Sequence, residues 1–257
     1  MTRGTTALPA PPSLHRVPRG GARQAPLVCL PFAGGGSRSY DDWQGLLPRS
    51  VDPVTVRLPG RESRLIEPLP TDLRGLAVGL AREIGPVLTG TFAVFGHSMG
   101  ALLAFEFVRE LRRSQGVQPA CLFVSGMRAP DRAKDVRKYG HLTDDELRTE
   151  IEQMGGTDPA VLRDPDLWEL VRPIIKSDLA ICDEYAYQAE EPLSCPVVAY
   201  GSTEDDELDQ DLLETWRGHT TGDFAARMFE GDHFYFQKRP DPLAMDLVDR
   251  LYRHVLD

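Results

Sequence analysis

The chain has 257 residues and carries 29 Lys and Arg against 39 Asp and Glu, a formal net charge of −10. A chain with this balance lacks the dense basic surface that binding to nucleic-acid phosphates requires, which excludes nucleic acid as a partner. Hydrophobic residues make up 41% of the chain and charged residues 26%, as in ordinary soluble globular proteins. No run approaches the roughly 18 consecutive apolar residues of a membrane span.

The N-terminal segment, residues 1–25, is rich in Pro, Arg, Gly and Thr and lacks the apolar run of a secretory signal. We therefore expect a mobile tail and a protein that stays in the cytoplasm. The four cysteines, Cys29, Cys121, Cys182 and Cys195, form no C-x-x-C pair, so the sequence indicates neither a zinc site nor a redox motif. We interpret them as buried free thiols.

Short apolar runs rich in Val, Phe and Leu alternate with longer segments of helical period, which is typical of a parallel sheet wrapped by helices. The predicted strands span residues 27–31, 54–58, 92–96, 121–125, 197–200 and 225–229. The predicted helices between them span residues 41–47, 72–88, 100–113, 208–217 and 242–255. Thr71 and Asp241 are the predicted N-caps of two of these helices.

The alternation breaks once, at about residues 130–193, where only helical stretches at 143–154 and 166–187 are found. An insertion of this length between two parallel strands usually covers the carboxyl edge of the sheet, where ligands bind in such folds. We therefore predict an α/β fold with one domain over residues 26–257 and a helical lid inserted at about 130–193.

The strongest chemical motif is Gly-His-Ser-Met-Gly at residues 96–100. A G-x-S-x-G string is weak evidence alone, but this one joins a predicted buried strand to a predicted helix, the setting of a nucleophile elbow. The glycines allow the sharp, strained turn, and the start of the helix directs its amides toward a developing oxyanion. Ser98 is therefore the candidate nucleophile.

A serine hydroxyl needs a general base, which lies late in the chain in this architecture. The other histidines fall in the tail, the elbow, the lid or the last helix, so His219 and His233 remain as candidates. His233 stands in a loop directly after the last predicted strand, where it can reach the elbow, and we favour it. His219 ends a helix before that strand, where capping of the helix is the simpler interpretation.

The acid that orients the histidine belongs on the loop after the strand at 197–200. This loop carries four carboxylates in a row, from Glu204 to Glu207. Asp205 is the candidate, with Glu204 and Asp206 as alternatives. We expect only one of the four side chains to face the site, because a run of charges is usually solvated.

An oxyanion hole is expected from backbone amides. One is that of Met99, directly after the nucleophile, and the other comes from the glycine-rich loop at 31–36. Ala33 is the favoured second donor and Phe32 the alternative. The same loop could hold a phosphate, but it lacks the Lys of a P-loop and the spacing of a dinucleotide-binding motif.

Four segments of the chain resemble the type II thioesterases of polyketide and nonribosomal peptide biosynthesis, within the α/β-hydrolase superfamily. They are L-P-F-A-G-G at 30–35, L-P-G-R-E at 58–62, G-H-S-M-G-A at 96–101 and G-D-H-F at 231–234. The second is the discriminating segment, because generic lipases and esterases share the elbow and lack it. The chain departs from the family at Phe32, where His is common, and at 202–206, where the family often has Gly-x-x-Asp-Pro.

The resemblance implies a triad of Ser98, Asp205 and His233 under a helical lid. It implies thioester substrates on the phosphopantetheine arm of an acyl carrier protein or peptidyl carrier domain, and an editing role that clears stalled acyl groups. It implies no metal and no cofactor. The alternatives are a carboxylesterase or acyl-CoA thioesterase, an acyltransferase or cyclase, and a catalytically silent binding module.

The negative charge is concentrated in one part of the chain. Residues 131–215 hold 8 basic against 23 acidic residues, whereas residues 1–40 hold five Arg and no acid. Carrier proteins of the family's pathways are themselves usually acidic, so we expect docking to avoid the lid and to use arginines of the first half. The candidates are Arg57, Arg61, Arg64, Arg109, Arg112 and Arg113.

Overall fold

A computed structural model of the chain describes residues 11–16, 25–135 and 138–256. Within these ranges, seven strands form one sheet in the order β1-β3-β2-β4-β5-β6-β7. The strands are β1 (Leu14–Arg16), β2 (Ala25–Leu30), β3 (Val51–Val56), β4 (Ala93–His97), β5 (Cys121–Ser125), β6 (Val197–Ser202) and β7 (Phe224–Phe229). β1 pairs antiparallel with β3 and the other neighbours are parallel, so the predicted α/β fold is confirmed.

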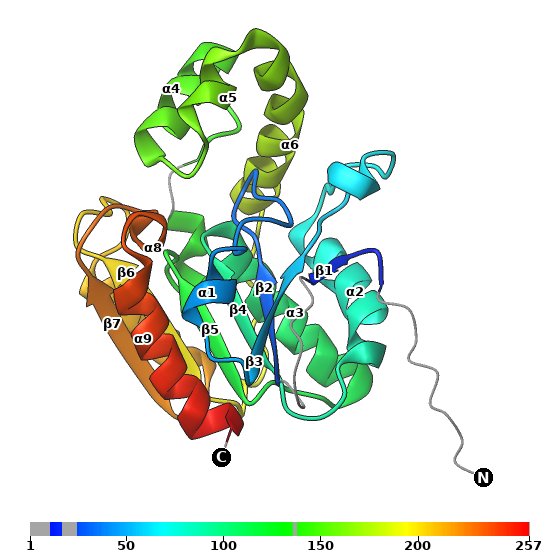
Figure 1. Ribbon diagram of the computed structural model, residues 1–257, viewed down its shortest axis with the longest axis vertical. Coiled ribbons are helices and arrows are strands. Elements are labelled where there is room, and N and C mark those ends of the chain that lie inside the picture. Colours follow the sequence, from blue (N-terminus) through cyan, green and yellow to red (C-terminus); the bar gives the residue numbers. More distant parts are fainter. Residues whose placement is uncertain (1–10, 17–24, 136–137, 257) are drawn as a thin grey trace.

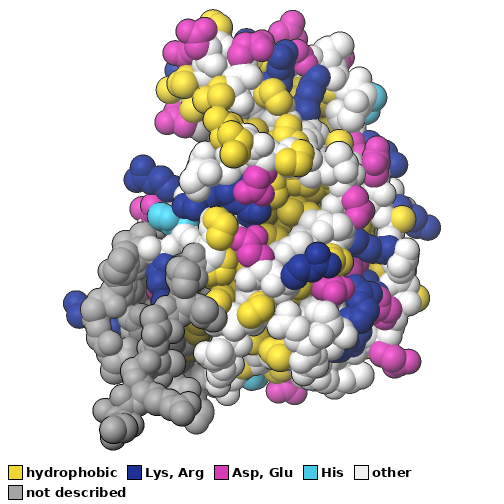
Figure 2. Space-filling model, turned by 90° about the vertical axis from the view of Figure 1, so that its right-hand side faces the viewer, with side chains coloured by type: hydrophobic (Ala, Val, Ile, Leu, Met, Phe, Trp, Pro, Cys, Tyr) yellow, Lys and Arg dark blue, Asp and Glu magenta, His cyan; other side chains and the backbone are white. Residues whose placement is uncertain are grey.

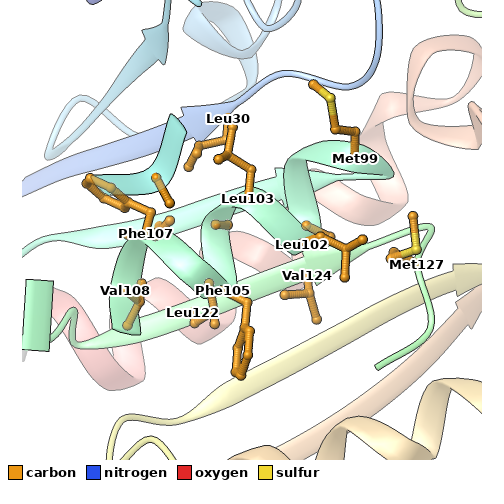
Figure 3. Packing of buried hydrophobic residues seen from close by; sticks show 14 of the residues in the cluster. Leu30, Met99, Leu102, Leu103, Phe105, Phe107, Val108, Leu122, Val124 and Met127 are labelled. Atoms are coloured by element: carbon orange, nitrogen blue, oxygen red, sulfur yellow. The ribbon is translucent and has the colours of Figure 1, made fainter. Parts of the chain in front are cut away.

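Helices cover both faces of the sheet (Figure 1). They are α1 (Trp43–Leu46), α2 (Leu73–Ile84), α3 (Met99–Gln115), α7 (Gln210–Glu214), α8 (Tyr235–Lys238) and α9 (Pro240–Leu251). Alternate side chains of the buried strands join opposite cores: Val94 packs with α2 and α3, whereas Ala93 and Phe95 pack with α1, α8 and α9. This alternation follows from the two-residue period of a strand. Figure 3 shows the core around α3.

β1 lies inside the segment that the sequence predicted as a mobile tail. Its three residues pair with Val54, Thr55 and Val56 of β3 at the edge of the sheet. The tail prediction is therefore wrong at Leu14–Arg16. Residues 1–10 and 17–24 of the predicted tail lie outside the described residues, and Ala25, its last residue, begins β2.

Both predicted N-caps are one or two residues away from the observed ones. α2 is capped by Asp72, whose side chain accepts from the amide of Gly75, so Thr71 is not the cap. α9 begins at Pro240, which fits the first turn because it has no amide to satisfy, and its N-cap is Arg239 instead of Asp241.

The lid is formed by three helices inserted between β5 and β6: α4 (Asp144–Met154), α5 (Pro159–Arg163) and α6 (Pro165–Asp183). Because the strands are parallel, the lid stands over their carboxyl ends (Figure 1). α4 opens with a capping box in which Thr143 and Glu146 satisfy each other's backbone amides. In the described part of the chain, no helix is long and apolar enough to cross a membrane.

A buried ion pair ties the lid to the body of the protein. Asp178 of α6 is fully buried and accepts two hydrogen bonds from Arg61, at 2.7 and 2.8 Å. It also accepts from the amide of Gly34 at 2.8 Å, while Arg61 donates to the carbonyl oxygen of Gly35 at 2.9 Å. The lid helix, the L-P-G-R-E segment and the glycine-rich loop are thus held at one point.

Three of the arginines that the sequence predicted for docking are buried, which makes that prediction wrong for them. Arg61 pairs with Asp178, Arg64 contacts Glu67 and Glu83, and Arg109 contacts Glu106 and Glu190. Its charge alone favours a surface position for an arginine, but a guanidinium is tolerated in the protein interior when carboxylates accept its hydrogen bonds.

The other three docking candidates are partly exposed and paired. Arg57 contacts Glu62, and both Arg112 and Arg113 contact Glu190. Their use in docking stays a prediction.

Replacing Asp178 by Ala is expected to lower the free energy of unfolding by about 3–5 kcal/mol, because it leaves the Arg61 charge buried without a partner. Glu169→Ala is the matched control on the same helix, since Glu169 is exposed and its pair with Arg172 contributes at most about 1 kcal/mol. Denaturant unfolding of both variants measures the difference. Equal midpoints for the two variants would contradict the anchoring role of Asp178.

Candidate active site

Ser98 occupies a sharp turn between β4 and α3. Its φ of 56° and ψ of −124° are strained for a residue with a side chain, and its amide donates to the carbonyl oxygen of Ser125 at 2.8 Å. A Cβ at Gly96 would lie 1.9 Å from the carbonyl oxygen of Gly100, and a Cβ at Gly100 would lie 2.3 Å from that of Leu30. Both glycines of the motif are therefore required by close backbone approach.

His233 lies in the loop between β7 and α8 and contacts one carboxylate of the acidic run. Its Nδ1 is 2.6 Å from Oδ2 of Asp205. The Asp205 side chain is only 6% exposed and that of His233 19%, whereas Glu204 and Asp206 are exposed. With Nδ1–H donated to a carboxylate, Nε2 carries the lone pair that a general base needs.

Ser98, Asp205 and His233 line one cavity of about 250 Å³ beneath the lid. The lid contributes Met154 and Leu179 to its wall. Figure 2 shows the lid above the body of the molecule, with hydrophobic side chains visible in the hollow between them. The structure thus brings the predicted nucleophile, base and acid together at the carboxyl edge of the sheet.

The two predicted oxyanion donors border the same cavity. Met99 is the first residue of α3, and Ala33 follows β2 in the glycine-rich loop. In the described ranges, neither amide donates a hydrogen bond to another protein atom. The alternative, Phe32, is buried with its ring 4.8 Å from that of Phe234, and it is not among the described residues that line the cavity.

The glycine-rich loop is held at two points after Ala33 by side chains for which the sequence predicted no such role. Asp178 accepts from the amide of Gly34, and Glu62 accepts from the amide of Ser37 at 2.9 Å. A Cβ at Gly34 would lie 2.8 Å from Cγ1 of Ile175 on α6, so the lid packs directly on this loop. The residue types gave no signal of these contacts, because the partners are far apart in the chain.

His97, inside the elbow motif, packs behind the candidate base. Its ring is 4.8 Å from that of His233, and its Nδ1 is 2.9 Å from Oγ of Ser125, which in turn contacts the hydroxyl of Tyr235 at 2.8 Å. Burial, and then the nearby His233, hold the pKa of His97 well below its usual value. A neutral ring at this position adds no charge that would oppose protonation of His233.

The alternative base, His219, is remote from this arrangement. It lies in the turn Thr215–His219 with Nε2 2.9 Å from Oδ1 of Asp131, and its ring packs against those of Phe105 and Tyr187. It does not line the cavity within the described residues.

A second possible nucleophile at the cavity is Cys182. Burial, and then the charges of Asp178 and Asp183, raise the pKa of its thiol, so the reactive thiolate is suppressed. The four cysteines are free, as expected. The described ranges also contain no group of three or more His, Cys, Asp or Glu side chains that could hold a metal ion.

This sheet has the α/β-hydrolase fold, and a serine at a strand-to-helix elbow with a histidine and a carboxylate on later loops is the arrangement typical of the serine hydrolases of that fold. Residues 25–251 match the thioesterase domain family, and the chain belongs to that family.

Individual relatives are similar to this chain over most of their own length. The gramicidin S biosynthesis protein GrsT of Aneurinibacillus migulanus is 36% identical over 81% of this chain and 82% of its own. The RedJ thioesterase of the prodiginine pathway in Streptomyces coelicolor has a TM-score of 0.81 at 36% identity, covering 91% of each chain. The type II thioesterase BorB of the borrelidin biosynthetic cluster has a TM-score of 0.83 at 31% identity, covering 93% of this chain and 97% of its own.

Replacing Gly126 by Ala is expected to lower turnover about tenfold or more, because misplacement of a catalytic group by about 1 Å is costly. The added Cβ would lie 2.4 Å from Cε1 of His97 and 3.2 Å from Cε1 of His233. Gly116→Ala is the matched control, since Gly116 has a similar φ of 67° and nothing within 4 Å of an added Cβ. Rates of Ser98 labelling by a fluorophosphonate compare them, and equal rates would contradict the packing role of Gly126.

Proposed function

We propose that the protein hydrolyses acyl thioesters through an acyl-enzyme formed on Ser98. The observation that carries this proposal is the contact between Asp205 and His233 at a cavity that Ser98 also lines. His233 Nε2 takes the proton from Ser98 Oγ as the oxygen attacks the thioester carbonyl carbon. The C–S bond then breaks, and the leaving sulfur takes that proton from the imidazolium.

Water completes the reaction by the same route. His233 removes a proton from water, the hydroxide attacks the acyl-enzyme, and the proton returns to Ser98 Oγ as the free acid leaves. In both halves the amides of Met99 and Ala33 donate to the oxyanion, since neither has another acceptor among the described residues. The largely buried Asp205 stabilises the imidazolium between the steps. None of these steps needs a metal or a cofactor.

The proposed substrate is an acyl group on the phosphopantetheine arm of an acyl carrier protein or peptidyl carrier domain. Two observations support this choice: the family match, and relatives that belong to the biosynthesis of gramicidin S and of borrelidin. A long flexible arm also fits a nucleophile that lies in a cavity under a lid, because the arm can carry the thioester inside while its protein stays outside. In such a pathway the reaction would clear stalled acyl groups.

Hydrolysis of one acyl group presented in three ways tests this function. An acyl carrier protein from the same gene neighbourhood is expected to give the highest kcat/KM, acyl-CoA a lower value and the oxygen ester the lowest. Ser98→Ala is expected to lower kcat by as much as 10⁶-fold, on the order found for serine hydrolases. A preference for the oxygen ester, or undiminished release by the Ser98 variant, would contradict the proposal.

Single substitutions of three neighbouring carboxylates test which of them is the acid of the triad. Asp205→Asn is expected to lower kcat by about 10⁴-fold, because the histidine then lacks the partner that fixes its tautomer and stabilises its charge. Glu204→Gln and Asp206→Asn are matched controls at exposed positions of the same loop and should stay within a few-fold of the wild type. A large loss at either control, with Asp205→Asn near full activity, would reassign the acid.

A further inference from the structure

The side chains that line the cavity beside Ser98 fall into two groups by exposure: exposed polar ones, here called the open side, and buried apolar ones, here called the closed side. Lys138, Gln153 and Glu204 line the open side and are exposed to solvent. Leu102 and Met127 line the closed side and are buried, at 1% and 9% exposure. A substrate that enters from solvent therefore meets polar groups first and apolar groups last.

Apolar side chains from three elements form the closed side. Leu102 lies on α3 four residues after Ser98, so it is one turn further along the same face of the helix. Met127 follows β5, and Figure 3 shows the side chains of Leu102 and Met127 turned toward each other. Leu179 and Cys182 of α6 complete this wall from the lid.

The walls of the closed side are fixed by contacts to the body of the protein. The carbonyl oxygen of Met127 accepts from Nε1 of Trp216, a fully buried side chain, at 2.7 Å. Leu179 directly follows Asp178, which is tied to Arg61 by the buried ion pair. The closed side thus has a set size although part of it belongs to the lid.

Met154 is, after Met99 and Met127, a third methionine that lines the cavity. Met154 ends α4 and packs against the hydrophobic cluster that contains Phe234, whereas Leu102 and Met127 belong to the cluster around α2 and α3. Gly155 and Gly156, both with positive φ, follow Met154 directly. The same residue type therefore lines both the closed side and the side next to the lid's first helix.

We propose that Leu102, Met127 and Leu179 bind the acyl chain and set the longest chain that the protein hydrolyses. This inference rests on the proposed function, because the reacting carbonyl must sit at Ser98 while the pantetheine arm extends to solvent. The acyl chain then points into the closed side. That side offers no polar partner from these three residues, so it takes uncharged, apolar acyl groups. One methylene more or less in such a pocket changes kcat/KM by about 10- to 200-fold.

Three methionine-to-alanine variants, assayed on pantetheine thioesters from acetyl to decanoyl, test the assignment. Met127→Ala is expected to raise the ratio of kcat/KM for long over short chains by about tenfold or more, because it lengthens the closed side. Met154→Ala is expected to change kcat/KM by the same factor for every acyl chain length. Met245→Ala, an exposed site on α9, should leave every rate unchanged.

A second substitution fills the cavity instead of enlarging it, so the test does not depend on the folding of Met127→Ala alone. Ala133 is buried and also lines the cavity, so Ala133→Leu is expected to shorten the longest accepted chain, and circular dichroism checks both folds. An unchanged chain-length profile in folded Met127→Ala or Ala133→Leu, or a profile shifted by Met154→Ala instead, would overturn the assignment. Activity on pantetheine thioesters without activity on acyl carrier proteins would contradict the proposed carrier substrate and leave the assignment of the acyl side standing.

Discussion

The backbone at Ser98 is held in a conformation that an isolated chain avoids, and the rest of the site depends on it. A φ of 56° with ψ of −124° costs on the order of 1–3 kcal/mol at a residue with a side chain. The surrounding structure supplies that energy: β4 is fully buried in the sheet, α3 is buried along most of its length, and Ser98 donates its amide to β5. The result is that Ser98 lines the cavity at the carboxyl edge of the sheet, next to Met99, whose amide has no acceptor among the described residues.

The lid shares one anchor with the glycine-rich loop. Asp178 holds both Arg61 and the amide of Gly34, so the part of α6 nearest the body moves only if a buried charge loses its partner. This arrangement explains why the Arg of the L-P-G-R-E segment is buried, and it places most of the lid's carboxylates on its outer surface, as at the top of Figure 2.

Much of the fold was predictable because buried parallel strands read as continuous apolar runs and the elbow fixes a strand-turn-helix order. All six strands predicted from such runs are present, with ends that differ from the predicted ones by at most three residues. β1 was missed because Leu14, His15 and Arg16 form no apolar run and become a strand only by pairing with the edge of β3. α5, five residues long, has too few turns to give a helical period.

The site was predictable where chemistry restricts the residue type and less so where it depends on contacts across the chain. The α/β-hydrolase architecture itself requires a serine between two closely packed glycines, and it places a histidine after the last strand. The choice among Glu204, Asp205 and Asp206 depends on which way a loop turns, and the sequence left it open. Arg61 and Asp178 are more than one hundred positions apart in the chain, so no sequence pattern indicated their pairing. From its charge alone, Arg61 was predicted to lie at the surface.

The proposed mechanism requires that the acyl group passes through a covalent bond to Ser98. Rapid quenching of the reaction with an acyl carrier substrate, followed by mass spectrometry of proteolytic peptides, tests it most directly. We expect a peptide containing Ser98 that carries the mass of the acyl group and loses it as free acid forms. Steady release of acid with no acyl group on that peptide, or with the acyl group on another residue, would contradict it.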